Sequence, residues 1–295
     1  MASDECIRVP DVQTRYLKRG GTLPLIVRDD SCLWVIYGEG GGCILKVAGA
    51  AAGVWIPLRG SLQVHSNGLN RAVRTGNVLI TEVDEGIRAS GYANGRWLAV
   101  LGHNRGWAQL LPTGLTPETP LFPNLHTADH EMRRSAIAVA RAHSPLELEG
   151  TMSALADKVD SLQASLRRAV ARCPGRTSAR RHQVFLRLQR VRNYIGVYCN
   201  HELSNEKLAL MVNLSPCYFL RTFKSVYQET PHAYLINQRL QRAERLLHSS
   251  NLAITEVALA CGFENRCVFS RVFHKNFGMT AQEARRRGSA CAAAG

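Results

Sequence analysis

The stretch Leu208-Ala-Leu-Met-Val-Asn-Leu214 is followed, 49 residues later, by the similar stretch Val257-Ala-Leu-Ala-Cys-Gly-Phe263. In the same way, Phe219-Leu-Arg-Thr-Phe-Lys224 is matched by Phe269-Ser-Arg-Val-Phe-His274 at an offset of 50 residues. The pattern of each copy is typical of a short helix, a tight turn and a second amphipathic helix. A helix-turn-helix unit places its second helix in the major groove of DNA. The sequence therefore predicts two such units in one chain.

Local signals in both copies agree with this interpretation. Ser215-Pro216 is typical of the start of a helix, and Gly262 can adopt the left-handed conformation that the second turn needs. Aromatic residues four positions apart predict a core-facing stripe in each second helix. These stripes are Phe219, Phe223 and Tyr227 in the first copy, and Phe269, Phe273 and Phe277 in the second.

The segment between the two copies predicts a long helix from Pro231 to about Ser249. Its apolar stripe consists of Leu235, Leu240, Ala243 and Leu246-Leu247. A helix of about 19 residues is about 28 Å long. It can hold two recognition helices near the separation of about 34 Å between successive major grooves on one face of DNA. One chain is therefore expected to contact two adjacent groove segments.

The excess positive charge lies in this half of the chain. The whole sequence of 295 residues has a net charge of +14. Residues 173–295 hold 18 Lys and Arg against 7 Asp and Glu, a net of +11, whereas residues 1–172 hold 19 against 16, a net of +3. Binding to nucleic acid requires a local basic excess because affinity depends on neutralising phosphates. A solvated basic surface that binds nothing explains the charge equally well, so the motifs decide between the two.

The C-terminal half resembles the AraC/XylS family of bacterial transcription regulators over about 105 residues. The resemblance rests on Ile254-Thr-Glu-Val-Ala-Leu-Ala-Cys-Gly-Phe263 and on Phe269-Ser-Arg-Val-Phe-His-Lys-Asn-Phe-Gly278, and it extends to Tyr234, Arg239 and Ala243. It implies an N-terminal cupin-like sensor, paired dimer helices and a C-terminal DNA-binding domain. It also implies activation of RNA polymerase at promoters, often in response to a small effector.

Carried over by position, the resemblance implies base-reading side chains on the second helix of each unit. These are Pro216, Cys217, Leu220 and Arg221 in the first unit, and Asn265, Arg266, Cys267, Ser270 and Arg271 in the second. The candidates for phosphate contacts are Lys224, His274 and Lys275. Because Cys217 and Leu220 cannot form bidentate base contacts, the first helix is expected to contact thymine methyl groups and to rely on Arg221 for a guanine or a phosphate. The family's Thr-Pro…Tyr ending is replaced by Thr280-Ala281…Ala284, which is expected to loosen the last helix.

Up to about residue 111 the sequence consists of short apolar runs separated by turn residues. Six runs predict strands: Cys32–Tyr37, Cys43–Val47, Val54–Pro57, Ser61–His65, Asn77–Thr81 and Trp97–Leu101. Strands of this length with regular turn signals favour an antiparallel sandwich or a small barrel. The stretch from Gly60 to Ile80 resembles part of a cupin-type jelly roll.

A metal-dependent cupin-like enzyme with an accessory DNA-binding domain is the alternative function. It would need two or three histidines and a carboxylate that converge inside the barrel. The matching strand offers only His65, and His103 lies far along the chain. We therefore expect no catalytic residues, no metal and no cofactor. A metal-free pocket for a small organic molecule is the hypothesis for this domain, and core packing explains the aromatic residues equally well. The lining candidates are Trp34, Tyr37, Trp55 and His65.

Two helices are expected after this domain. The first covers Asp129 to Ala142, and the second begins at Ser144-Pro-Leu-Glu147, where Ser and Glu form a capping box around a first-turn proline. The second helix carries an apolar stripe that suits a coiled-coil dimer contact, and packing against the protein's own barrel is the equal alternative. The stripe consists of Leu155, Val159, Leu162 and Leu166. Cys173-Pro-Gly-Arg-Thr-Ser then marks a linker, in which Cys173 is expected to be exposed.

The predicted fold is α+β, with an N-terminal cupin-like antiparallel β-barrel, dimer-type helices and a C-terminal all-α domain of two helix-turn-helix units joined by a long helix. The expected boundaries are 1–125 for the sensor, 126–172 for the helical dimerisation segment, 173–184 for the linker and 185–290 for the DNA-binding domain. No apolar stretch approaches the roughly 20 residues that span a bilayer, and the acidic N-terminus does not resemble a secretory signal. We expect a cytoplasmic homodimer whose partners are double-stranded DNA, RNA polymerase and a small-molecule effector.

Overall fold

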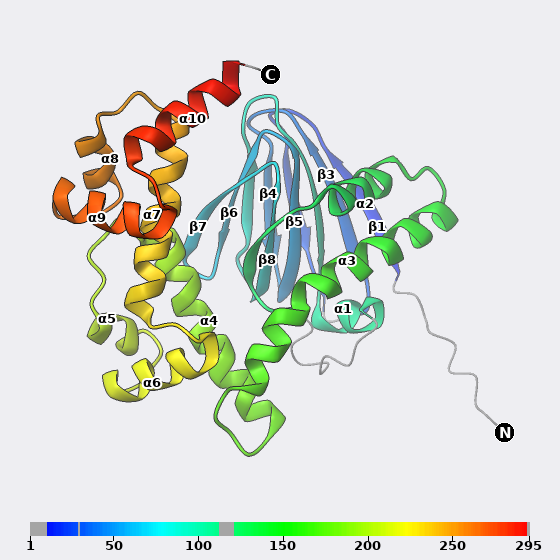
Figure 1. The fold of residues 1–295 in the computed structure, drawn as a ribbon. Coiled ribbons are helices and arrows are strands. Elements are labelled where there is room, and N and C mark those ends of the chain that lie inside the picture. Colours follow the sequence, from blue (N-terminus) through cyan, green and yellow to red (C-terminus); the bar gives the residue numbers. More distant parts are fainter. Residues whose placement is uncertain (1–10, 29, 112–120, 294–295) are drawn as a thin grey trace. The chain divides into compact units, whose positions relative to one another are not determined.

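The structure is a computed structural model that describes residues 11–28, 30–111 and 121–293. The chain divides into two compact units, Met1–Ala171 and Arg172–Gly295. The first combines two β-sheets with helices and the second is helical throughout its described residues, so the protein is of the α+β class (Figure 1). None of the helices in the described ranges has the length and apolar character needed to cross a membrane.

Two open sheets form the first unit. The larger sheet contains, in spatial order, β1 (Val12–Leu17), β3 (Leu33–Glu39), β10 (Arg96–Gly102), β5 (Ala51–Arg59), β8 (Asn77–Asp84) and β11 (Asn124–Thr127). The smaller sheet contains β2 (Thr22–Ile26), β4 (Ile44–Ala48), β9 (Arg88–Gly91), β6 (Ser61–Ser66) and β7 (Leu69–Arg74). The six predicted strands are confirmed as β3, β4, β5, β6, β8 and β10.

The prediction of a closed antiparallel barrel needs correction. The first five strands alternate between the two sheets, so strands two apart in sequence run in the same direction. As a result β1 pairs in parallel with β3, and β2 pairs in parallel with β4. The remaining pairs are antiparallel. Among the described residues the two mixed sheets keep separate strand orders and do not close into a barrel.

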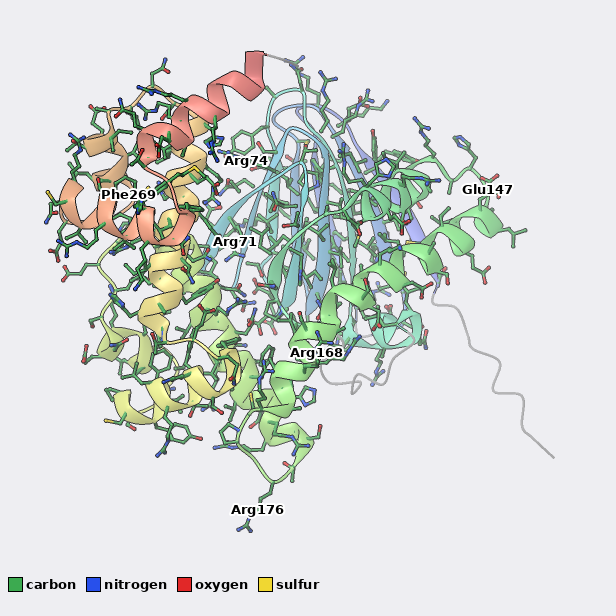
Figure 2. All side chains as sticks on the ribbon, in the orientation of Figure 1. Arg71, Arg74, Glu147, Arg168, Arg176 and Phe269 are labelled. Atoms are coloured by element: carbon green, nitrogen blue, oxygen red, sulfur yellow. The ribbon has the colours of Figure 1, made fainter. Side chains whose placement is uncertain are left out.

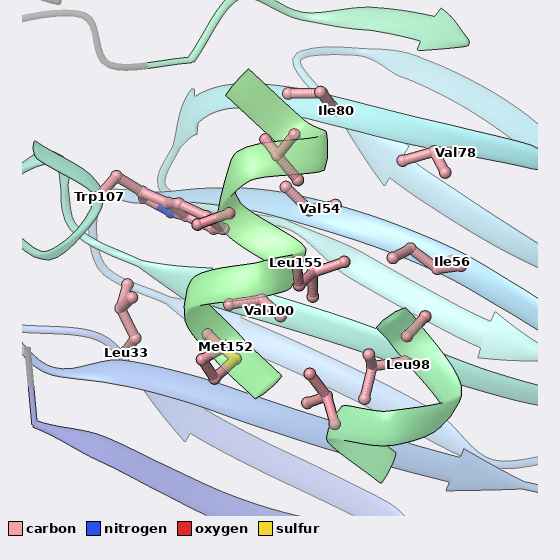
Figure 3. Packing of buried hydrophobic residues seen from close by; sticks show 14 of the residues in the cluster. Leu33, Val54, Ile56, Val78, Ile80, Leu98, Val100, Trp107, Met152 and Leu155 are labelled. Carbon is pink, nitrogen blue, oxygen red and sulfur yellow. The ribbon is translucent and has the colours of Figure 1, made fainter. Parts of the chain in front are cut away.

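Apolar side chains fill both faces of the larger sheet. One cluster lies between the two sheets and includes Ile36, Trp55 and Trp97. The other lies between the larger sheet and the helices α1 (Asn104–Leu110), α2 (His130–Arg141) and α3 (Pro145–Ala171). Figure 3 shows Met152 and Leu155 of α3 over the strands that carry Val54, Ile56 and Val100. The first unit therefore has three layers: helices, the larger sheet and the smaller sheet.

The apolar stripe of α3 packs within this unit. Leu155 and Val159 are 2% and 1% exposed and belong to the cluster beneath the helix, and Leu162 packs against it. Leu166 is 5% exposed. Gln163 is also fully buried, and its side-chain oxygen accepts a hydrogen bond from the backbone N–H of Phe122 (2.7 Å). The stripe therefore packs within its own unit, and Leu155, Val159 and Leu166 have little surface left for a partner, whereas Leu162 is partly buried.

The predicted capping box of α3 is confirmed. Ser144 Oγ accepts a hydrogen bond from the Glu147 N–H (3.2 Å), and Glu147 Oε2 accepts one from the His143 N–H (2.9 Å). Hydrogen bonds from the backbone N–H groups of His143 and Ser144 stabilise the charged Glu147 carboxylate and lower its pKa. The cap therefore satisfies N–H groups at the start of the helix and fixes where α3 begins.

The second unit is a series of seven helices in its described residues. They are α4 (Ser178–Tyr198), α5 (Asn205–Leu210), α6 (Pro216–Tyr227), α7 (Pro231–Ser249), α8 (Ile254–Ala260), α9 (Arg266–Phe277) and α10 (Ala281–Ala293). The long connecting helix has the predicted bounds. Helices α5 and α6 lie toward one end of α7, and α8 and α9 lie toward the other (Figure 1).

The segment expected to be a linker is partly ordered against these helices. Cys173 is 5% exposed, so the expectation of an exposed thiol is wrong. The neighbouring Arg172 Nε donates a hydrogen bond to the carbonyl oxygen of Val226 (2.8 Å). Helix α4 begins at Ser178, six residues before the expected end of the linker at 184, because the Thr177 hydroxyl caps it by accepting from the Arg180 N–H (3.2 Å).

Candidate nucleic-acid interface

The turns of the two copies have the same geometry. Asn213 and Gly262, which are 49 residues apart, both have a left-handed backbone, with φ of 52° and 85°. The residue after each one donates the same hydrogen bond across the turn. Leu214 N–H donates to Ala209 O (3.1 Å), and Phe263 N–H donates to Ala258 O (3.0 Å). The sequence repeat is thus also a repeat of structure, and α5–α6 and α8–α9 are each a helix-turn-helix unit.

Helices α6 and α9 are anchored by the predicted aromatic stripes. Phe219, Phe223, Phe269 and Phe273 are fully buried. In α6 the ring centroids of Phe219 and Phe223 are 5.7 Å apart, and in α9 those of Phe269 and Phe273 are 5.3 Å apart. These rings pack the inner face of each helix and leave the opposite face to solvent. The aromatic side chains are therefore core residues rather than groups that stack on bases.

The opposite faces carry most of the side chains expected to contact DNA. Those exposed on α6 are Pro216, Cys217, Arg221 and Lys224, and those exposed on α9 are Arg266, Cys267, Ser270, Arg271, His274 and Lys275. Neither helix contains an Asp or Glu. A basic face without carboxylates suits the phosphates and the acceptor-rich guanine edges of DNA.

Two expected base-reading residues have a different position or role. Leu220 is only partly exposed and lies at the flank of α6 near the aromatic core. Asn265 is the N-cap of α9, and its side-chain oxygen accepts a hydrogen bond from the Val268 N–H (2.9 Å). The oxygen is therefore engaged in holding the helix. The equivalent cap, Ser215, makes no side-chain capping bond, although Pro216 starts α6 as predicted.

Two residues of the outward faces were missed. At about 100° per residue, Tyr218 and Val268 lie beside Arg221 and Arg271 on the side opposite the aromatic stripes. Val268 is 40% exposed, and the Arg221 guanidinium lies 5.8 Å from the centre of the Tyr218 ring. A helical projection centred on the aromatic stripe could have found both from the sequence.

The arginines of helix α7 bind carbonyl groups at the ends of α4 and α8. Arg239 Nε donates to Cys199 O (2.7 Å) at the end of α4, and its Nη2 donates to His201 O (3.0 Å). Arg242 Nε donates to Ala260 O (3.2 Å) at the end of α8. Carbonyl groups at helix C-termini lack partners within the helix, and they attract positive charge. These contacts fix α4 and α8 against the same connecting helix.

The last helix is well capped, which corrects the expectation that its sequence loosens it. Thr280 Oγ1 accepts from the Glu283 N–H (3.2 Å), and Glu283 Oε2 accepts from the Thr280 N–H (2.7 Å). The second bond helps to lower the pKa of Glu283. Ala281 and Ala284 are buried in the cluster that also contains Phe269 and Phe273. Small residues at these positions therefore fit the packing of α10.

The thiols of this chain fall into two groups. Cys217 and Cys267 are exposed on α6 and α9, whereas the other five described cysteines are buried. Burial raises the pKa of the Cys173 thiol to about 12 and the pKa of the Cys261 thiol to about 11. Buried thiols of this kind are inert, because the thiolate is the reactive form. Both thiols that are exposed among the described cysteines lie on the candidate interface.

The four candidate pocket residues of the first unit do not share one site, although Trp34 and Trp55 lie in the same layer. Trp55 is fully buried between the sheets, and its Nε1 donates to Thr81 Oγ1 (3.2 Å). Trp34 packs at the edge of this layer, whereas Tyr37 points to the other face of β3 because side chains alternate along a strand. His65 is exposed on the outer face of the smaller sheet. Across the described ranges, no three His, Cys, Asp or Glu side chains form a group that could hold a metal ion.

Comparison with known proteins places the similarity in the second unit. A family model described as a helix-turn-helix domain matches residues 208–287. The probable transcriptional regulator LumQ of Photobacterium leiognathi is 32% identical over 88 residues, which cover 30% of this chain and 36% of that protein. The MmsAB operon regulatory protein of Pseudomonas aeruginosa is 30% identical over 94 residues, 32% of this chain and 31% of that protein. The chain spans about a third of the length of these curated relatives.

Two solved structures are similar to about a third of the chain. The DNA-binding domain of AdpA, a global transcriptional factor in complex with a target DNA, is 29% identical with a TM-score of 0.35 and covers 37% of this chain and 97% of that chain. A regulator with an AraC-type DNA-binding domain from Chromobacterium violaceum is 28% identical with a TM-score of 0.33, covering 35% and 91%.

Residues 208–287 of the second unit are therefore a helix-turn-helix domain. The matched segment begins in α5, ends in α10 and contains both recognition helices. Relatives that share it are named as regulators of transcription.

Proposed function

We propose that this chain is a sequence-specific DNA-binding protein that regulates transcription, with double-stranded DNA as its partner. The observation that carries the proposal is the pair of recognition helices, α6 and α9, each with an exposed basic face that lacks carboxylates. The names of the relatives over this domain support the same function. The net charge of +11 in residues 173–295 supplies the positive potential that phosphate binding needs.

The proposal is tested by fluorescence-anisotropy titration of the full-length protein with DNA fragments from around its own gene. Random DNA of the same length is the control, and both are titrated at several salt concentrations. A regulator is expected to bind one fragment about 10³-fold or more tightly than random DNA. Its affinity should also fall steeply with salt as counterions are released. Equal, weak binding of all genomic fragments and of random DNA would contradict a sequence-specific regulator.

We further propose that the protein activates RNA polymerase at its promoters in response to a small-molecule effector bound by the first unit. The order of a two-sheet unit, two helices and a helix-turn-helix domain supports this, because it is the order that the family resemblance implies. All four tryptophans lie at positions 34, 55, 97 and 107, so their fluorescence reports on the first unit. An effector is expected to shift the thermal unfolding of that signal and to change the yield of transcript from the bound promoter in a purified system.

A homodimer is also proposed. Because Leu155 and Val159 are buried within their own unit, a dimer contact has to use other side chains. Sedimentation of the full-length protein at micromolar concentration tests this. A monomer under these conditions, with and without DNA, would rule the dimer out.

The alternative of a cupin-like metal-dependent enzyme has no supporting contact. His65 is exposed on β6, and His103 Nδ1 accepts the Arg105 N–H (3.4 Å) at the start of α1. These histidines lie on different elements and face no common site. Metal analysis of the purified protein tests the alternative, and stoichiometric iron, zinc or manganese would favour it.

A further inference from the structure

The two recognition helices have the same rotational setting relative to their cores. Each has 12 residues, and the second begins 50 residues after the first. Each ends at a left-handed residue, Gln228 or Gly278, whose N–H donates to the carbonyl four residues earlier at 2.9 Å. The second pair of neighbouring rings is also alike, since both pairs are tilted and have centroid distances of 4.7 Å in α6 and 4.5 Å in α9. Residues 50 positions apart therefore lie at the same angle to the aromatic core of their own helix-turn-helix unit.

At the outward positions the two helices present the same chemistry. Cys217 is matched by Cys267, and Arg221 by Arg271, and all four are exposed. Lys224 and His274 form a third pair of nitrogen donors. Cys217 and Cys267 are also the two exposed thiols among the described cysteines. The flanking positions differ, since Tyr218 is matched by Val268, so the likeness is confined to the centre of each face.

Cysteine and arginine four residues apart can read a defined pair of bases. An arginine guanidinium donates two hydrogen bonds to guanine O6 and N7, and small apolar groups contact the thymine methyl. A free thiol behaves as a small hydrophobic group. Four residues of helix advance about 6 Å along its axis, close to the rise of two base pairs.

We propose that the DNA site of this protein consists of two half-sites that contain the same pair of bases. In each half-site a thymine and a guanine lie about two base pairs apart. The half-sites are centred about one helical turn apart, at 10–10.5 base pairs, one for each recognition helix. Cys217 and Arg221 read the first half-site, and Cys267 and Arg271 read the second half-site. The bases that flank each pair differ between half-sites because Tyr218 and Val268 differ. This inference rests on the proposed function and adds to it the form of the target.

The test begins with selection of DNA from a library with a randomised centre of about 30 base pairs, using the full-length protein. The expected result is a consensus with two like elements at the stated spacing. Two unrelated elements, or a single element, would overturn the inference while leaving a specific DNA-binding protein in place. A failure to enrich any sequence would overturn both the inference and the proposed function.

Point variants then assign each element to its helix. Arg221→Lys and Arg271→Lys keep the charge but lose the planar fork that recognises guanine. Each is expected to abolish the preference for guanine in one half-site only, and to weaken the selected site about tenfold more than random DNA. Arg176→Lys is the matched control, because Arg176 is exposed in the loop before α4 and projects away from the helices (Figure 2).

The pattern of lost preferences decides the assignment. Loss of guanine preference at the same relative position in opposite half-sites supports the inference. If the two lysine variants change different bases, or change none, the two helices do not read alike and the inference is wrong. Fragments with one half-site inverted or replaced, titrated with the unmodified protein, give the same comparison without any change to the protein.

Discussion

The turn of the second helix-turn-helix unit gives a sharp prediction about stability. Gly262 has a φ of 85°, and a Cβ added there would lie 2.8 Å from the carbonyl oxygen of Asn200 and 3.0 Å from its carbonyl carbon. The atoms it would meet belong to the backbone, so they cannot move aside as a flexible side chain can. Gly262→Ala therefore combines the cost of a left-handed conformation with the cost of a steric clash.

A second glycine separates these two costs. Gly278 has a φ of 68°, but nothing lies within 4 Å of the place where its Cβ would be. A left-handed non-glycine residue costs about 1–2 kcal/mol, and alanine recovers about 0.4–1 kcal/mol of that by restricting the unfolded chain. Gly278→Ala is thus expected to reduce the free energy of unfolding by about 1 kcal/mol or less. Overpacking of a close-packed site adds about 1–3 kcal/mol, so Gly262→Ala is expected to cost about 1–4 kcal/mol.

The assay exploits the uneven distribution of tryptophan. All four tryptophans lie in the first unit, whereas the described part of the second unit is helical. Urea unfolding of the full-length variants is followed by tryptophan fluorescence for the first unit and by circular dichroism at 222 nm for the helices of both units. The part of the helical transition that does not coincide with the tryptophan transition reports on the second unit, which holds most of the helical residues. Gly262→Ala should move the helical transition to lower urea and leave the tryptophan transition unchanged. If Gly262→Ala lowers the free energy of unfolding no more than Gly278→Ala does, the close approach of residue 262 to Asn200 is wrong.

Three further outcomes are expected. Phe273→Ala should destabilise the second unit by about 3–5 kcal/mol, measured by the same helical transition, because it empties a fully buried ring position. Among the seven cysteines whose side chains the structure describes, alkylation of the native protein should modify Cys217 and Cys267 first, as seen by peptide mass spectrometry, and bound target DNA should protect both; rapid reaction of the five buried thiols would contradict this. The pKa of Glu283 is lowered in the folded state by its bond to Thr280, so its contribution to stability is present above its ordinary pKa near 4.5 and is lost as the pH falls through its lower folded value. Acid titration of Glu283→Gln should therefore show a weaker loss of α10 helicity between pH 5 and pH 3 than the unmodified chain shows, and identical titrations would count against the cap.

The second unit could be predicted closely because its signals are local. The four-residue spacing of Phe269, Phe273 and Phe277 sets the inner face of a helix, and Gly262 sets the turn before it. Each of these signals acts within a few residues of the element that it determines. The internal repeat then supplied a second copy of every signal. The positional comparison missed Tyr218 and Val268. Their place on the outward face depends on rotation about the helix axis rather than on sequence position.

The first unit was harder because its determining contacts are distant in sequence. Six strands were recognisable as apolar runs, but the pairing of β1 with β3 joins residues about 21 positions apart across an intervening strand of the other sheet. No residue type in the sequence indicates a pairing of this kind. The edge strands β1 and β2 also have mixed burial patterns, so their apolar signal is weak. Parallel pairing and the open edges therefore emerged only in the structure.

The position of α3 could have been settled from the strands rather than from the helix. A 4-3-4 spacing of apolar residues fits a coiled coil and a sheet-covering helix equally well, so the stripe itself does not discriminate. The central strands do discriminate, because β5 and β10 are buried along nearly their whole length on both faces. A strand with one face in solvent alternates apolar and polar residues, whereas continuous runs such as Leu98-Ala-Val-Leu101 need a cover on each side. The smaller sheet covers one side of β5 and β10, and α3 with its apolar stripe is the nearby element able to cover the other.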